Sequence, residues 1–357
     1  MGRRIFAFEW LIFIPAILLM CSGLVTLLSL SPEFFYQQLF YAAVSLVAFF
    51  LFIRIDFDLY HYVDRITYIV TILLLLLTFA GENVRGSVRW LIIGSLQIQP
   101  SEVVKPFFLV CLASLLVRFP PTRPKWILLH IGLLILPVLL IFKQPDLGNA
   151  IVYTAMWSSM IIVAGIPLLV ILGGIILSLV ILPLGYRLLH EYQKLRIMTF
   201  LNPLLDPQGA GYNAIQAMIA VGSGQLVGRG FGRGTQTLLK FLPEHHTDFI
   251  FATLVEESGF FGGMMLLSLF FVLLWNLLSL ARRRVMQPMF FLYTVGFFTQ
   301  ILTHVIINIG MNMGIVPITG ITLPFVSAGG SSLVSLWVGL GILFAGMQRP
   351  ADRLNRL

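Results

Sequence analysis

The sequence predicts an all-α fold, that of a polytopic helical membrane protein with about ten transmembrane helices. Of its 357 residues, 58% are apolar and only 11% are charged, and the mean hydropathy is +0.95. A water-soluble domain is nearer to about 45–50% apolar and about 25% charged, so that class is excluded. The apolar residues also form continuous tracts, whereas the strands of a membrane barrel would alternate apolar and polar residues. Helices are therefore the remaining structure that can satisfy the backbone hydrogen-bonding groups in lipid.

Ten apolar tracts are long enough to span the membrane, at 10–30, 38–55, 66–80, 101–117, 126–142, 147–164, 166–186, 258–281, 288–308 and 331–347. Their direction follows from charge, because cytoplasmic loops are rich in Lys and Arg. With both termini placed in the cytoplasm, the inside segments hold 13 basic residues, and the short outside loops hold three, Arg85, Arg89 and Lys143. The net charge of +8 is therefore assigned to membrane topology, and no nucleic acid partner is predicted.

Two regions break this pattern within what we expect to be one transmembrane domain, residues 1–357. The first is a long extracellular loop, 187–250, which we expect to carry part of the functional site, since loops of this length are commonly functional. Inside it, 213–221 has apolar residues at helical spacing, which predicts a helix in the membrane interface. The second region, 308–332, is too apolar for a solvated loop and too rich in Gly and Pro for one straight helix. A broken element facing a site is expected there.

Titratable residues gather where the long loop meets the eighth span. Glu244, His245, His246 and Asp248 lie close together in the sequence, and clustered titratable groups in a cleft are typical of acid–base chemistry. Asp248 is the candidate catalytic residue, and the alternative is a helix N-cap. Adjacent histidines do not face one direction on a helix, so a metal site is not predicted here. Glu256 shares the helical face of Asp248, two turns further on, and is a candidate supporting group.

A second group of polar residues lies at the outer ends of the fourth and sixth spans. Glu102 and Lys105 are three residues apart, so they share a helix face as an ion pair. Ionisable residues inside a span tend to face a cavity or a pathway, and the alternative is a purely structural pair. The pattern at Lys143 and Asp146 predicts a turn followed by the cap of the sixth span, and a role in the site is the alternative.

Cations on the outside could bind an anionic group. The stretch 222–234 alternates glycines with arginines, and both Gly-rich backbone and Arg side chains bind phosphate. It has no GK[ST] and so is not a P-loop, and a mobile surface loop is the alternative. The cationic long loop suits an anionic lipid headgroup. The candidate anion-binding residues are Arg85, Arg89, Arg196, Arg229 and Lys240.

Six motifs in this order resemble those of the SEDS family (shape, elongation, division and sporulation), also called the FtsW/RodA/SpoVE family. They are QPSE at 99–102 with Lys105, QPDLG at 144–148, FLNP at 200–203 with GYN at 211–213, PEHHTDF at 243–249, EESG at 256–259, and the block from NIGM at 308–311 to GGS at 329–331. The resemblance covers nearly the whole chain, and GTQ at 234–236 before FLPE at 241–244 is closer to the RodA-like branch. The sequence departs from the family pattern at His245 and at 258–260, and neither departure touches the carboxylates.

The resemblance implies a peptidoglycan glycosyltransferase that polymerises lipid II into glycan strands for cell-wall elongation and rod shape. Its expected place is the bacterial cytoplasmic (inner) membrane, with the active site on the outer face. Its expected partners are lipid II, the growing lipid-linked glycan, a class B penicillin-binding protein and the elongation machinery. A divalent cation such as Mg²⁺ is the one cofactor that this chemistry suggests.

The roles that follow for the residues are those of an inverting glycosyl transfer with a β-1,4 product. Asp248 would remove the proton from the acceptor hydroxyl, because an aspartate is ionised at neutral pH. The departing diphosphate would be stabilised by cations, namely Arg85, Arg89, Lys105, Arg196 and Lys240. Supporting roles fall to Glu102, Lys105, Glu244, His246 and Glu256.

Other functions are compatible with the same composition. A flippase or transporter of lipid-linked precursors would spread its charges through the membrane depth, whereas the candidate residues here cluster on the outside. A division-branch (FtsW-like) polymerase and an inactive scaffold for a transpeptidase are the remaining alternatives.

Overall fold

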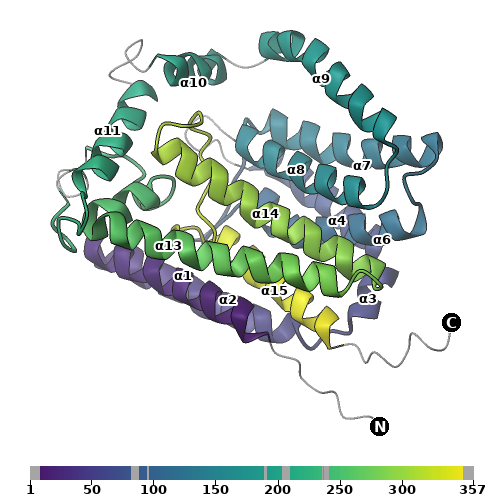
Figure 1. Ribbon diagram of the computed structural model, residues 1–357, viewed down its shortest axis with the longest axis horizontal. Helices are drawn as coiled ribbons and strands as arrows, with labels where there is room; N and C mark the ends of the chain where they lie inside the picture. Colours follow the sequence, from purple (N-terminus) through teal and green to yellow (C-terminus); the bar gives the residue numbers. More distant parts are fainter. Residues whose placement is uncertain are drawn as a thin grey trace.

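The computed structural model describes residues 9–81, 88–94, 96–188, 191–202, 210–234, 236 and 241–348. Over this part of the chain the protein is a polytopic helical bundle, and each of the ten predicted spans corresponds to a helix (Figure 1). These helices are α1 (Trp10–Leu30), α2 (Pro32–Phe52), α4 (Asp64–Leu77), α5 with α6 (Pro100–Val103 and Lys105–Arg118), α7 (Pro124–Lys143), α8 (Leu147–Val163), α9 (Leu168–Leu188), α13 (Ile250–Arg283), α14 (Pro288–Asn312) and α15 (Gly330–Met347).

Short elements connect these spans. They are α3 (Phe57–Tyr62), a 3-10 turn η1 (Thr78–Ala80), an antiparallel hairpin of β1 (Leu91–Ile93) and β2 (Leu96–Ile98), α10 (Glu191–Leu201) and α11 (Ala210–Ser223). The predicted interface helix at 213–221 therefore lies inside α11. Six of the described helices, α1, α2, α7, α13, α14 and α15, are long and apolar enough to cross a membrane.

Local sequence explains where several helices begin. Ser31 accepts a hydrogen bond from the Glu33 N–H at the start of α2, and Asp146 accepts one from the Asn149 N–H at the start of α8. Five helices, α2, α5, α6, α7 and α14, carry Pro in their first turn, where the missing N–H costs no helical hydrogen bond. The prediction that Asp146 caps the sixth span is confirmed.

The first residues of α1 and the last residues of α13 and α15 meet at one end of the bundle (Figure 1). Arg283 lies 3.9 Å from Glu9, and Arg284 donates to the carbonyl of Met347 at 3.5 Å. This is the end that the basic residues assign to the cytoplasm. At the opposite end, near the start of α13, lies a group called here the carboxylate cluster: Glu244, Asp248, Glu256 and Glu257.

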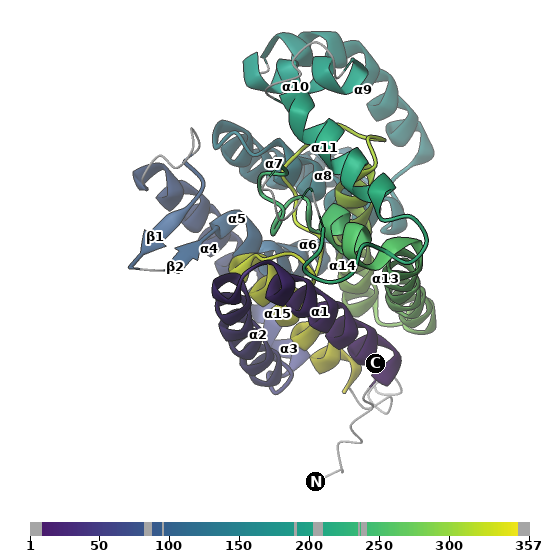
Figure 2. The same cartoon turned by 90° about the vertical axis from the view of Figure 1, so that its left-hand side faces the viewer.

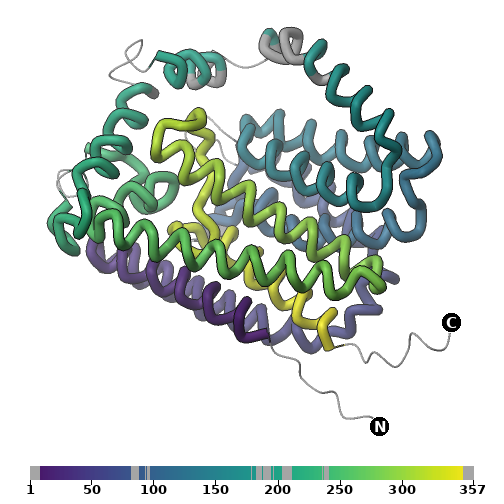
Figure 3. The backbone as a smooth tube through the Cα atoms, viewed as in Figure 1, coloured from purple at the N-terminus to yellow at the C-terminus, as the bar shows by residue number. Residues whose placement is uncertain are grey.

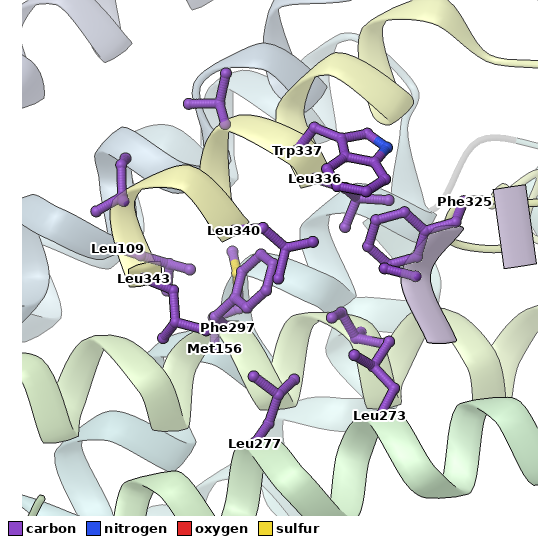
Figure 4. Packing of buried hydrophobic residues seen from close by; sticks show 14 of the residues in the cluster. Leu109, Met156, Leu273, Leu277, Phe297, Phe325, Leu336, Trp337, Leu340 and Leu343 are labelled. Atoms are coloured by element: carbon purple, nitrogen blue, oxygen red, sulfur yellow. The ribbon is translucent and has the colours of Figure 1, made fainter. Parts of the chain in front are cut away.

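The core surrounds α15, whose residues are nearly all buried, and the neighbouring α14 (Figure 4). Trp337 lies at its centre, with Phe325 at 5.8 Å and Phe49 at 5.6 Å between ring centroids, both edge-on. The core fixes α15 against α2 and α14. It thereby fixes the two ends of the segment that joins α14 to α15.

Two irregular stretches interrupt the bundle near the carboxylate cluster. Residues 313–329, called here the α14–α15 connection, have no helix and run between α14 and α15 (Figure 3). This is the broken element that the sequence predicts. In α13 the helix is kinked at Gly259, whose φ is 70°.

Helices α9, α10 and α11 form an arch on one side of the bundle (Figure 2). Among the described side chains of α9, none is buried, as expected for a helix that faces lipid or a partner on several sides. Among the described residues of these helices, those of α11 pack closely on the bundle, against α13 and α14. Helix α11 therefore roofs the region where the carboxylate cluster lies.

Candidate active site

Asp248 lies in a tight turn, residues 244–249, directly before α13. The turn is closed by a hydrogen bond from the Thr247 N–H to the Glu244 carbonyl at 3.1 Å. Glu244 has a φ of 51°, a left-handed conformation that costs free energy in a residue with a Cβ and is commonest at functional sites. The N-cap position of α13 is occupied by Phe249, so the alternative that Asp248 caps the helix is wrong.

The α14–α15 connection holds this turn through its backbone. The carbonyl of His246 accepts from the Ala328 N–H at 2.9 Å, and the carbonyl of Thr247 accepts from the Ser327 hydroxyl at 2.7 Å. A buried backbone carbonyl without a partner is costly, so these bonds fix the path of the turn. The half-buried Asp248 side chain points toward Gly320 of the same connection, where a Cβ would lie 3.4 Å from Asp248 Oδ2.

Two asparagines of α14 hold the carbonyl of Asp248 itself. Asn308 Nδ2 lies 2.9 Å and Asn312 Nδ2 lies 3.1 Å from this oxygen. Asn308 also donates to the carbonyl of Ile321 at 2.7 Å, and Asn312 accepts from the Ala252 N–H at 3.2 Å. The turn, the connection and the first turn of α13 are therefore one hydrogen-bonded unit.

His246 and Glu244 lie beside Asp248 in the same turn. The imidazole of His246 stacks on Phe34 of α2, with ring centroids 4.1 Å apart and an angle of 11° between the rings. Its Nε2 lies 4.0 Å from a carboxylate oxygen of Glu244. The stacking fixes the ring, and both side chains stay partly exposed, so each can meet a ligand that reaches Asp248.

Glu102 and Lys105 form the predicted ion pair, deep in the protein. Lys105 Nζ lies 2.7 Å from Glu102 Oε1, and its side chain is wholly buried. The third member is His304 of α14, whose Nε2 lies 2.9 Å from Lys105 Nζ. Lys105 is therefore enclosed in the protein, with its ammonium group directed at Glu102 and His304.

Asp146 forms a second buried acidic centre at the start of α8. It accepts from Gln99 Nε2 at 2.7 Å and from Asn149 Nδ2 at 2.9 Å, and Arg89 Nη1 lies 3.8 Å away. Asn149 also lies 3.4 Å from the hydroxyl of Ser101, the residue next to Glu102. The motifs around 99–102 and 144–148 are thus joined in space.

Glu256 and Glu257 bind the glycine-rich loop. Glu257 accepts from the Ser29 hydroxyl at 2.7 Å and from the Gly232 N–H at 2.9 Å. Glu256 Oε1 accepts from the Gln236 N–H at 2.9 Å. The described part of the 222–234 stretch is therefore docked on the α13 kink, and the expectation of a mobile surface loop is wrong.

The predicted cations are spread over several elements. Arg89 is half-buried, and its Nε is buried without a hydrogen-bond partner among the described residues. Arg229 is exposed on the glycine-rich loop. Arg196 belongs to α10, and its side chain lies outside what the structure describes, as do Arg85 and Lys240 entirely.

Sequence reasoning missed His304, Asn308 and Asn312. They are polar residues at spacings of four along α14, and each is at most 2% exposed. Polar residues at this spacing share one helix face, and inside a span they need partners. This periodicity was the signal that could have found them.

A family model and a curated relative each match most of this chain. A family model described as a cell cycle protein, FTSW_RODA_SPOVE, matches residues 3–349. The peptidoglycan glycosyltransferase MrdB of Escherichia coli strain K12 is 40% identical over 287 residues, which cover 78% of this chain and 76% of MrdB.

Two solved structures resemble the fold over most of its length. One is a chain from a study of the structural coordination of polymerization and crosslinking by a peptidoglycan synthase complex. It has a TM-score of 0.83 and 29% identity, and covers 96% of this chain and 98% of that one. The other is the rod shape determining protein RodA of Thermus thermophilus, with a TM-score of 0.71 and 27% identity, covering 95% and 96%.

Proposed function

This chain belongs to the FtsW/RodA/SpoVE family, and from this premise we propose that it polymerises lipid II at the outer membrane surface with Asp248 as general base. The activity itself is that of a peptidoglycan glycosyltransferase, as in its relative MrdB. The protein is a multi-pass inner-membrane protein. The likeness to MrdB and RodA favours cell-wall elongation over division as its role.

The observation that carries the proposal is the way Asp248 is held. Its turn is bonded through three consecutive carbonyls, and the carboxylate lies half-buried beside Gly320. A base must be held in place to act in the transition state, and a turn fixed at three carbonyls provides this. Because the Asp248 side chain is only partly buried, an incoming hydroxyl can still reach it.

In the proposed reaction the 4-hydroxyl oxygen of the acceptor GlcNAc attacks the anomeric carbon of the lipid-linked donor MurNAc. A C–O bond forms on one face while the bond to the diphosphate oxygen breaks on the other. The centre is inverted to a β-1,4 link, the undecaprenyl diphosphate leaves, and Asp248 takes the hydroxyl proton. A positioned general base contributes about 10²–10⁴-fold to such a step.

The leaving diphosphate needs positive charge close by. Arg89 is the described cation best suited to this task, because its Nε is a buried donor that a phosphate oxygen could satisfy. Arg229, Arg196, Arg85 and Lys240 remain candidates from the sequence. In the part of the chain that the structure describes, no three His, Cys, Asp or Glu side chains are grouped to hold a metal, so no step is assigned to Mg²⁺.

We infer that the active protein works with a transpeptidase, a class B penicillin-binding protein. The support is the solved relative, which comes from a complex that coordinates polymerization and crosslinking. The exposed apolar side chains of the described helices give such a partner a surface within the membrane. Cytoplasmic termini and an outer active site follow from the charge asymmetry of the loops.

One experiment tests the assignment of Asp248. The purified protein, with and without its transpeptidase, is reconstituted with labelled lipid II, and glycan polymer is resolved on gels. We expect Asp248→Asn to lower the polymerisation rate at least about 10²-fold. The matched control, Asp58→Asn, changes a carboxylate at the opposite end of the bundle and should leave the rate unchanged.

Two results would count against the proposal. Polymerisation by the Asp248→Asn protein at the wild-type rate would remove Asp248 from the mechanism. Transport of lipid II across the bilayer without any polymer would instead favour the flippase alternative. The same vesicles report both outcomes, because transport and polymerisation are measured on one labelled substrate.

A further inference from the structure

A polar stripe on α14 connects the buried ion pair to the Asp248 turn. It consists of His304, Asn308 and Asn312, which are 2%, 0% and 0% exposed. Their spacing of four residues puts them on one face of the helix. That face contacts the α14–α15 connection and the Asp248 turn, and each of the three side chains bonds at least one backbone carbonyl there.

Two contacts, with Lys105 and with the carbonyl of Thr322, determine which nitrogen of His304 carries the proton. An ammonium has three donors and no acceptor, and Lys105 is an ammonium because it lies 2.7 Å from the Glu102 carboxylate. His304 Nε2, 2.9 Å from Lys105 Nζ, must therefore accept. The proton of the neutral imidazole is then on Nδ1, which lies 3.1 Å from the carbonyl of Thr322 and donates to it.

The bond to Thr322 continues into the site. The neighbouring carbonyl, of Ile321, accepts from Asn308 at 2.7 Å, and the same amide group donates to the Asp248 carbonyl at 2.9 Å. Thr322 also donates its hydroxyl to Ser332 at 3.2 Å, which ties the connection to the start of α15. The segment opposite the Asp248 side chain is thus held at two consecutive carbonyls from α14.

We propose that His304 is a positioning residue for the Asp248 site: Lys105 holds the imidazole at Nε2, and the Nδ1–H on the other side of the ring holds the α14–α15 connection at Thr322. In this arrangement the Glu102–Lys105 pair affects the Asp248 site through the imidazole of His304. Lys105 need not touch the substrate. The catalytic part of this proposal rests on the function proposed above, whereas the tautomer is a property of the protein alone.

The tautomer is tested on the full-length protein in lipid nanodiscs without substrate. Histidine labelled with ¹⁵N distinguishes the two neutral tautomers by chemical shift, and the His304→Asn protein identifies the His304 signals among the six histidines. We expect the Nδ1–H form in the wild type, and in Lys105→Met a shifted Nε2 signal, because the donor beside this nitrogen is gone. An Nε2–H tautomer in the wild type, or a Lys105→Met spectrum identical to the wild type, would overturn the proposal.

Two variants separate the two contacts of the imidazole. The amide nitrogen that His304→Asn introduces can take the place of Nδ1 and keep the bond to Thr322, whereas the longer amide of His304→Gln can reach toward Lys105 in place of Nε2. We expect His304→Asn to keep kcat near the wild-type value and His304→Gln to lower it by about tenfold to a hundredfold. KM for lipid II should be unchanged in both, because the side chain is buried.

The opposite order of the two kcat values would contradict the proposal. Equal losses of kcat and of thermal stability in both variants would assign His304 a structural role only. If the wild-type protein forms no polymer at all, the proposed function fails, and the tautomer experiment still gives its answer because it uses no substrate.

Discussion

The side-chain amide nitrogen of Asn308 lies 2.9 Å from the backbone carbonyl oxygen of Asp248. The same nitrogen lies 2.7 Å from the carbonyl oxygen of Ile321, so each of its two hydrogens has an acceptor. One buried asparagine therefore joins the turn that carries the candidate base to the segment that faces it. The two parts are 73 residues apart in sequence, from Asp248 to Ile321, and they cannot move independently while this amide is present.

Replacing Asn308 with Ala should lower both stability and activity. The buried carbonyl of Ile321 loses its donor, which costs about 1–3 kcal/mol for an unsatisfied group, and the carbonyl of Asp248 keeps only Asn312. We expect a lower unfolding temperature and a decrease of about tenfold in the polymerisation rate. Asn308→Asp should be worse, because it places a carboxylate against two carbonyl oxygens.

The matched control is Asn276→Ala in α13. Asn276 donates to the Val272 carbonyl of its own helix at 2.7 Å, on an exposed surface far along α13 from the site. The loss of this side chain should change neither the unfolding temperature nor the polymerisation rate measurably. A fully active and stable Asn308→Ala protein would show that the amide bridge has no role in the site.

Neutralising one member of the Glu102–Lys105 pair should destabilise the protein more than removing both charges. A single buried charge without its partner costs about 3–5 kcal/mol, whereas replacing both members is often close to neutral. We expect Lys105→Met to unfold at a lower temperature than the double variant Glu102→Gln/Lys105→Met. The double variant should regain stability and still lack activity, since His304 has lost the donor that holds its ring at Nε2.

Thermal unfolding of the wild type, Lys105→Met and the double variant in the same detergent tests the expected order of stability. Polymer formation by the same proteins tests the expected loss of activity. A double variant that is as unstable as Lys105→Met would mean that the side chains matter for packing and not for charge. An active double variant would place the pair outside the site.

Much of the fold was predictable, because apolar tracts report burial in lipid directly. The first span was predicted at 10–30, and α1 runs over Trp10–Leu30. The eighth span was placed at 258, but α13 begins at Ile250. Glu256 and Glu257 lie between, and carboxylates ordinarily argue against a helix in the core. Their charges are met by loop N–H groups and by the hydroxyl of Ser29, a partner that the sequence cannot identify.

The site was predictable only in part, for a related reason. Asp248 stood out because titratable residues cluster around it, and Glu102 with Lys105 because they lie in a span. His304 and Asn308 bind backbone carbonyls of the irregular α14–α15 connection. A sequence does not show where the backbone carbonyls of an irregular segment lie, because tertiary packing determines the path of that segment.

Glu257→Gln should release the glycine-rich loop from α13. The carboxylate accepts from the Ser29 hydroxyl and from the Gly232 N–H, and an amide has only one accepting oxygen for both. Arg229 and Arg233 are exposed on this loop, so trypsin reports its release. We expect faster cleavage after these arginines in Glu257→Gln, with cleavage unchanged in Glu33→Gln, whose carboxylate lies exposed at the start of α2. Equal cleavage rates in all three proteins would contradict the docking role of Glu257.

Gly320→Ala should impair catalysis beyond its effect on stability. Gly320 has a φ of 76°, where a residue with a Cβ is strained by roughly 1–2 kcal/mol, and the new methyl group would lie 3.4 Å from Asp248 Oδ2. Gly94 in the turn of the hairpin is a matched control, since its φ is 64° and a Cβ there meets no atom within 4 Å. Both substitutions should lower the unfolding temperature by similar amounts, whereas only Gly320→Ala should lower kcat, because only its methyl group restricts the space in which Asp248 meets the acceptor hydroxyl. Equal kcat values for the two variants would mean that the space beside Gly320 is not where the acceptor binds.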